Sequence, residues 1–160
     1  MSKSFTDSVG RTWVCDVDVS ALRRCRSRLG VDLATAATDP QKIGPIIEDP
    51  VALADVLYCV LEPKLTAQGV SDDAFGAALA GEIIIAARDA LLAGLIDFFP
   101  QPQRDVLALA IGKARQIEET ILGRLRQAVQ SGDLEQALDA AMRKELTSGE
   151  SSTGQQEPVE

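Results

Sequence analysis

Apolar residues between Ser71 and Pro100 follow the spacing of one face of an α-helix. They recur at steps of three and four residues, which is the main sequence signal of a helix that packs on a core. Ser71 can cap the first turn, and the residue before Pro100 is disfavoured in the helical region. The pattern predicts one long helix over residues 71–100 at the centre of the core.

Three glycines, Gly76, Gly81 and Gly94, interrupt this predicted helix. Each weakens a helix by about 1 kcal/mol relative to alanine. We therefore expect them to mark positions where another helix packs closely. The charged residues within the segment break its apolar run, so a membrane span is not expected.

An alternating pattern near the N-terminus predicts a β-hairpin over residues 4–19. One face carries Trp13, Cys15, Val17 and Val19, which alternate with mostly polar residues; this is the period of a strand with one buried face. Residues 7–10 (Asp-Ser-Val-Gly) have the composition of a turn. A lone hairpin is marginal in water, so it should pack on the helices or join a sheet of a neighbouring subunit.

Two further helices are predicted between the hairpin and the central helix. One covers residues 21–29, with Ser20 as its N-cap and Gly30 as its C-cap. The other begins at Asp49-Pro50, where an aspartate cap precedes a proline in the first turn. Pro63 should end or kink this helix because it cannot donate the backbone hydrogen bond of a helix interior.

The C-terminal part of the chain changes from amphipathic to polar. Pro102 starts an amphipathic helix that reaches about Gln130, and a last amphipathic segment covers Leu134–Leu146. From Thr147 the chain is almost without apolar residues, so residues 147–160 are predicted to be a disordered acidic tail. The predicted fold is mainly α (α+β), a single domain over residues 1–146 in which the hairpin precedes a bundle of about four to six helices.

The composition excludes several classes of chemistry. The 160 residues include no histidine and three cysteines without metal-ligand spacing. The commonest general base and the commonest zinc ligand are therefore missing, and no phosphate-binding or nucleophile motif is present. We predict no enzyme activity, no cofactor and no metal. The scattered cysteines, taken as small buried hydrophobic residues, fit a reducing compartment.

The charge is −8 overall and is unevenly distributed. Residues 1–30 carry a net +3, residues 31–132 a net −6 and residues 133–160 a net −5. Four of the basic residues lie within 23–28, where they could contact phosphate, but no aromatic residues interleave with them. A solvated or protein-facing basic surface is the preferred interpretation, because an acidic protein repels nucleic acid and anionic membranes.

Acidic residues supply two further candidates. Asp16 and Asp18 share one face of the predicted strand and could bind a cation, although no other ligand lies near them in the sequence, which favours solvent exposure. Glu82 lies among apolar residues; if buried it would need a basic partner, and otherwise it lies at the edge of the apolar face.

Three stretches together resemble the small tail assembly chaperones of long-tailed bacteriophages and prophages. They are WVCDVDVSALRRCRSRLGVDL (13–33), DPVALADVLYCVLEP (49–63) and GVSDDAFGAALAGEIIIAARDALLAGLIDFFP (69–100). In that family a short N-terminal β element precedes a helical body and a polar tail. The resemblance covers roughly residues 5–130 and consists of the overall pattern, with no diagnostic motif.

The resemblance implies a non-enzymatic role in the cytoplasm of the host cell. Such chaperones bind the long, apolar, helical tape measure protein, keep it soluble and recruit tail tube protein, and they are missing from the finished virion. The recruiting surface would then be the apolar faces of the helices 51–62 and 72–99. Its anchors would be Phe75, Leu79, Ile83, Leu91, Leu95, Phe98 and Phe99.

Other functions remain open at this point. A structural virion protein, either a head–tail connector or a tail component, could oligomerise through the edge of the hairpin. A regulatory or DNA-associated protein could use the arginines of residues 23–28, and an enzyme is the least favoured reading. A homo-oligomer is compatible with any of these functions.

Overall fold

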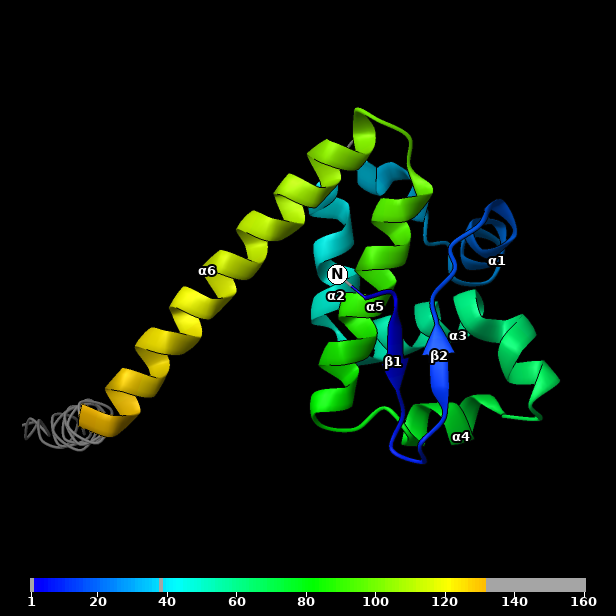
Figure 1. Ribbon diagram of the computed structural model, residues 1–160, viewed down its shortest axis with the longest axis horizontal. Helices are drawn as coiled ribbons and strands as arrows, with labels where there is room; N and C mark the ends of the chain where they lie inside the picture. The colour runs from blue at the N-terminus through cyan, green and yellow to red at the C-terminus, as the bar shows by residue number, and fades with distance from the viewer. Residues whose placement is uncertain (1, 38, 132–160) are drawn as a thin grey trace, which may run out of the picture. The chain divides into compact units, whose positions relative to one another are not determined.

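The computed structural model describes residues 2–37 and 39–131, and the chain divides into two compact units, Met1–Lys113 and Ala114–Glu160. The predicted segment 134–146 and the predicted tail 147–160 lie outside the described residues. Within these limits the fold is mainly helical with an N-terminal antiparallel hairpin, as the sequence predicts (Figure 1). The single-domain boundary at residue 146 stays a prediction.

The elements follow the chain in a simple order. The strands are β1 (Ser4–Thr6) and β2 (Thr12–Val14), and the 3-10 helices are η1 (Leu33–Ala37) and η2 (Pro40–Ile43). The α-helices are α1 (Val19–Leu29), α2 (Gly44–Glu48), α3 (Pro50–Ala67), α4 (Asp72–Ala77), α5 (Glu82–Phe98) and α6 (Gln103–Ser131). The first unit contains every element up to α5 and the first turns of α6.

The hairpin is held by a buried carboxylate in its turn. β1 and β2 pair antiparallel with Phe5 opposite Trp13. The Asp7 side chain accepts hydrogen bonds from the Trp13 indole (2.9 Å), the Arg11 guanidinium (2.7 Å) and the backbone N–H groups of Arg11 (2.9 Å) and Val9 (3.0 Å). Gly10 closes the turn with a φ of 89°, a value that favours glycine. One side chain therefore fixes both the turn and the inward-facing tryptophan.

The hairpin packs on the helices of its own unit. β1 contacts α5 and β2 contacts α3 (Figure 1). Trp13 is 1% exposed, and its ring meets that of Phe75 edge to face with 6.1 Å between the ring centroids. Of the residues predicted to alternate inward, Trp13 and Cys15 are buried and Val17 is partly buried, whereas Val19 is exposed in the first turn of α1. The strand ends at Val14 because Asp18 starts a helix.

Asp18, and not Ser20 as predicted, caps α1. Its side chain accepts a hydrogen bond from the backbone N–H of Ala21 at 2.6 Å. The C-cap prediction is confirmed, because Gly30 has a φ of 68° and its N–H returns to the Arg26 carbonyl at 3.2 Å. An aspartate is as good a cap as a serine, and the earlier of the two adds two residues, Val19 and Ser20, to the helix.

Helix α3 begins as predicted but passes through Pro63. Asp49 caps the helix by accepting a hydrogen bond from the N–H of Val51 at 2.9 Å, and Pro50 follows as the first helical residue. Of the two outcomes predicted for Pro63, an end or a kink, the end does not occur, since α3 continues to Ala67. A proline in a helix leaves the carbonyl four residues earlier without its usual donor; here that carbonyl belongs to Cys59.

Arg24 supplies the donor that Pro63 lacks. Its Nε donates to the Cys59 carbonyl oxygen at 2.8 Å, and an Nη donates to the Val60 carbonyl oxygen at 3.2 Å. Glu62 lies 3.5 Å from the same guanidinium and pairs with Arg28 at 2.6 Å. The contact between α1 and α3 therefore also compensates for the proline inside α3.

We expect Arg24→Ala to cost about 2 kcal/mol of unfolding free energy, because it leaves two carbonyl groups without their charged donor. In a Pro63→Ala background residue 63 regains its N–H, so the same change should cost clearly less. Urea unfolding of wild type, the two single variants and the double variant measures the coupling free energy between residues 24 and 63. Equal costs in both backgrounds would contradict a compensating role for Arg24.

The predicted helix over residues 71–100 is in fact two helices. Ser71 caps α4 as expected, but the helical hydrogen bonding stops after Ala77 and resumes with α5 at Glu82. Gly81 has a φ of 63°, and the Ala78 carbonyl accepts a hydrogen bond from the N–H of Ser8 in the hairpin turn at 3.2 Å. A glycine conformation and a contact from a distant part of the chain together interrupt the helix.

Only one of the three glycines marks a close approach. A Cβ on Gly94 would lie far inside van der Waals contact with the Cys15 carbonyl oxygen and 3.2 Å from Val17 Cγ2. A Cβ on Gly76 or Gly81 would meet no atom within 4 Å, so the prediction is wrong for these two. At Gly94 the partner is the backbone that follows β2 and not another helix, as had been expected.

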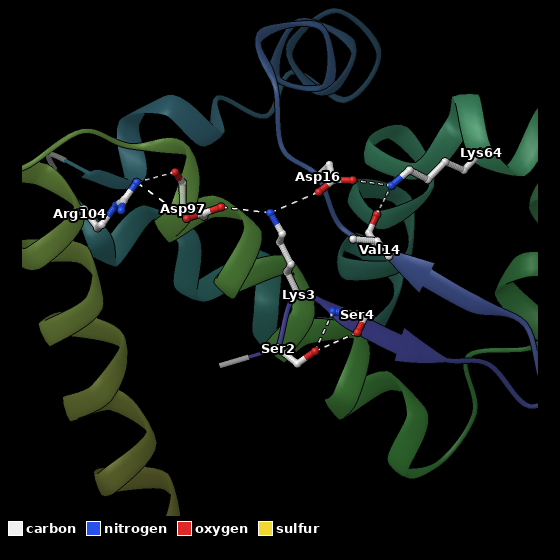
Figure 2. A network of polar contacts seen from close by, with 8 residues as sticks. All are labelled: Ser2, Lys3, Ser4, Val14, Asp16, Lys64, Asp97 and Arg104. Carbon is white, nitrogen blue, oxygen red and sulfur yellow. Dashed lines mark hydrogen bonds and ion pairs between the residues drawn. The ribbon is translucent and has the colours of Figure 1, made fainter.

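An ion-pair network joins the N-terminal segment to three helices of the first unit (Figure 2). Lys3 Nζ lies 3.1 Å from Asp97 of α5 and 3.4 Å from Asp16. Lys64 of α3 donates to the same Asp16 at 2.8 Å and to the Val14 carbonyl at 2.6 Å. Arg104, in the first turn of α6, donates to the Asp97 carbonyl at 2.9 Å. The side chains are largely exposed, so the network orients these segments more than it stabilises them.

Candidate partner-binding surface

The seven residues predicted to contact a partner lie in or against the core of the first unit. Phe75, Leu91 and Leu95 are fully buried, and Leu79 and Phe99 are 7% exposed. Ile83 and Phe98 are partly buried and pack against the same core. These residues do not form an exposed surface in the described part of the chain, because the hairpin and α3 cover the helices that carry them.

Exposed apolar residues gather instead on α6. Of the eleven large apolar side chains that are exposed among the described residues, seven belong to this helix. They are Val106, Leu109, Ile117, Ile121, Leu122, Leu125 and Val129. Large apolar side chains on the surface are ordinary when they are scattered, whereas a contiguous group indicates an interaction site.

Five of these residues share one face of the helix and are called the α6 stripe: Ile117, Ile121, Leu122, Leu125 and Val129. Their exposed fractions run from 43% to 64%. They recur at steps of three and four residues and cover about 18 Å of helix at 1.5 Å per residue. Glu118 lies on the same face, one turn before Leu122, so the face is uninterrupted by charge only from Ile121 onward. Leu107 and Ile111 precede the stripe at the same spacing and are buried within the first unit.

The charges around the C-terminal half of the α6 stripe are all positive. Arg124 and Arg126 precede and follow Leu125, so they lie about 100° from it on either side of the helix. Both are exposed, and they are the only charged residues between Thr120 and Ser131. Gln116 and Gln127 lie on the opposite face, about 180° from Leu125. The surface is therefore an apolar stripe with a cation on each flank and a neutral back.

The apolar spacing of the sequence predicts the helix that carries the α6 stripe, but it does not show that the stripe is exposed. The pattern of apolar residues along α6 is that of any helix covering a core. The one sequence feature that could have indicated an exposed helix was its length. The helix α6 has 29 residues, whereas helices of globular proteins average 11–12. A helix of this length exceeds what a small helical body needs to cover itself.

The other candidate sites have structural partners. Asp18 is a helix cap, and hydrogen bonds from Lys64 lower the pKa of Asp16 below its ordinary value. No group of three or more acidic or cysteine side chains is placed to hold a metal ion in residues 2–37 and 39–131. Burial raises the pKa of the Cys15 and Cys25 thiols to about 12, so both are protonated at neutral pH.

Three of the four arginines of α1 have protein partners, although Arg26 and Arg28 are also exposed, as is Arg23. Arg24 and Arg28 contact α3, and Arg26 pairs with Asp32 at 2.6 Å. Glu82 is exposed in the first turn of α5, where a negative charge suits the positive end of the helix dipole. The paired arginines and Glu82 therefore have roles in folding, and the α6 stripe is the remaining candidate site.

Comparisons with known proteins add no relative: no family model, no curated protein and no solved structure matches the chain. No helix in the described residues combines the length and the hydrophobicity needed to cross a membrane.

Proposed function

We propose that this protein is a non-enzymatic tail assembly chaperone of a bacteriophage or prophage. It binds the helical tape measure protein in the host cytoplasm, keeps it soluble and presents it to tail tube protein. The observation that supports the proposal is the α6 stripe, about 18 Å of exposed apolar helix surface. The pattern resemblance over residues 5–130 supplies the identity of the partner.

An exposed apolar helix face suits a partner that is itself an amphipathic helix. Such helices bind through side chains spaced at three and four residues, which fit the gaps of a facing helix with the same spacing. A tape measure protein offers this pattern many times along its length. The proposal thus moves the recruiting surface from α3, α4 and α5, whose apolar residues fill the core, to α6.

The alternative of a virion protein that oligomerises through its hairpin has less support. β1 and β2 have three residues each, and very short edge strands are a device that prevents pairing with other chains. β1 also contacts α5 within its own unit. The edge available to a neighbouring subunit is therefore small.

Replacing Ile121 and Leu125 together by serine should abolish most of the binding. Each side chain contributes about 1.5–3 kcal/mol when a partner buries it, so we expect binding to weaken at least a hundredfold. The measurement is co-expression with a helical fragment of a tape measure protein, followed by co-purification and titration of the soluble complex. Gln116→Ser with Gln127→Ser, on the opposite face, is the matched control and should bind normally.

Two results would count against the proposed function. One is a fragment that stays insoluble with the wild-type protein. The other is unchanged binding by the Ile121→Ser, Leu125→Ser variant when its urea unfolding equals that of wild type. Stoichiometric presence of the protein in purified particles would favour the virion alternative.

A further inference from the structure

We propose that the α6 stripe selects partner helices whose apolar face is flanked by acidic residues. This inference rests on the proposed helix-binding function and adds the chemistry of the partner. Its basis is the arrangement of Ile121, Leu122, Leu125 and Val129 between Arg124 and Arg126. From Thr120 to Ser131 there is no acidic residue, although the chain as a whole has a net charge of −8.

The two arginines are available to a partner. Both side chains are exposed, and within residues 2–37 and 39–131 neither takes part in an ion pair. The nearest acidic residue in α6 is Glu119, five residues before Arg124, which is more than one helical turn away. A helix lying on the stripe would place its own flanking side chains beside these cations, where carboxylates are favoured and ammonium groups are repelled.

The charges and the composition of α6 also argue against three other partners for the α6 stripe: a second copy of the chain, nucleic acid and a membrane. The α6 helix of a second copy, when it lies parallel or antiparallel about Leu125, would bring the same two arginines to the contact, so like charges would meet on its flanks. Nucleic acid would be held by only two cations, with apolar side chains between them that have nothing to contact. Helices that lie on membranes usually carry aromatic residues and a strongly charged polar face, whereas α6 has no aromatic residue and a back of glutamine and threonine. An acidic-flanked protein helix satisfies both the apolar and the charged part of the surface.

The test uses three designed helical peptides that share one apolar face and differ only in their flanking residues, which are glutamate, glutamine or lysine. Fluorescence anisotropy with the full-length protein gives their dissociation constants at low and at physiological ionic strength. Two exposed ion pairs predict that the glutamate peptide binds about tenfold tighter than the lysine peptide. The ratio should fall as salt is added, because exposed charges are screened.

Matched variants separate the local charge from the net charge. Arg124→Gln with Arg126→Gln should bring the three peptides to nearly equal affinity. Gln116→Glu with Gln127→Glu makes the same change in net charge on the opposite face and should preserve the preference for the glutamate peptide. Circular dichroism establishes that both variants keep the helical content of wild type.

The outcomes distinguish this inference from the function on which it rests. Equal binding of all three peptides by wild type would retain helix binding and overturn charge selection. Binding of none would overturn both. Anionic vesicles and a duplex oligonucleotide serve as further probes, and binding of either one in preference to the glutamate peptide would overturn the inference in favour of a lipid or a nucleic-acid partner.

Discussion

Replacing Gly94 by alanine should destabilise the protein by about 3 kcal/mol, at the upper end of the cost of overpacking a core. The added methyl group would clash with the Cys15 carbonyl oxygen and lie 3.2 Å from both the Cys15 carbonyl carbon and Val17 Cγ2. The obstacle is mainly backbone, so no rotation of a side chain relieves it. To make room, the segment after β2 has to move away from α5. Urea unfolding followed by circular dichroism measures the loss.

Two comparisons make the Gly94 prediction specific. Gly76→Ala, in α4, adds the same methyl group where no atom lies within 4 Å, so it should be neutral or stabilise by up to about 1 kcal/mol. Val17→Ala removes only the side-chain part of the clash and should recover little of the stability lost in the Gly94 variant. Wild-type stability in Gly94→Ala would show that the close contact between α5 and Cys15 does not exist in solution.

Replacing Asp7 by alanine should cost about 3 kcal/mol at neutral pH. Asp7 is 4% exposed and Trp13 is 1% exposed, so the change leaves the indole N–H buried without an acceptor and removes two bonds to Arg11. The hairpin turn and the position of Trp13 depend on these bonds. Urea unfolding followed by tryptophan fluorescence reports on both the hairpin turn and the position of Trp13, because Trp13 is the only tryptophan of the chain.

The Asp7 contribution should also depend on pH in a defined direction. Burial by itself raises the pKa of this carboxyl, but the hydrogen bonds from Trp13, Arg11 and Val9 outweigh it and leave the pKa below the ordinary 3.8. A carboxyl with a lower pKa in the folded state stabilises the fold above about pH 4 and loses this contribution as the pH falls through the folded pKa. The difference between wild type and Asp7→Ala should therefore shrink in acid.

Asp55, exposed on α3, provides the control for the Asp7 variant. Asp55→Ala removes a carboxylate that has no hydrogen bond or ion pair within the described residues, and it should change stability by less than about 0.5 kcal/mol at any pH. Equal effects of the two substitutions would contradict the assigned role of Asp7. A difference between wild type and Asp7→Ala that grows in acid would contradict the direction of its pKa shift.

The α6 stripe shows how an element can be predicted correctly while its role is missed. The helix after Pro102 was predicted to reach about Gln130, and α6 ends at Ser131. Whether Ile121 and Leu125 face a core or solvent depends on which other elements reach that part of the helix. No periodicity within α6 contains that information, so the sequence by itself favours the apolar faces of α3, α4 and α5 as the binding surface.

Local sequence determined where three of the helices begin or end. Asp49-Pro50, Gly30 and Ser71 act within a few residues of themselves, through a side-chain cap, a fixed proline φ or a left-handed glycine. Such effects need no distant partner, and the sequence alone therefore established the mainly helical class, the hairpin and these three helix ends.

Only the tertiary structure decided the features that depend on distant partners. Arg24 reaches across to the Cys59 carbonyl group that Pro63 leaves without a donor, and α3 continues where its own sequence predicts an end or a kink. Ser8 and Gly81 together break the expected central helix, and the same tertiary packing buries its apolar face while the α6 stripe stays exposed. The physical reason is the same in each case: burial and hydrogen-bond satisfaction are properties of pairs of segments, and a single segment cannot specify its partner.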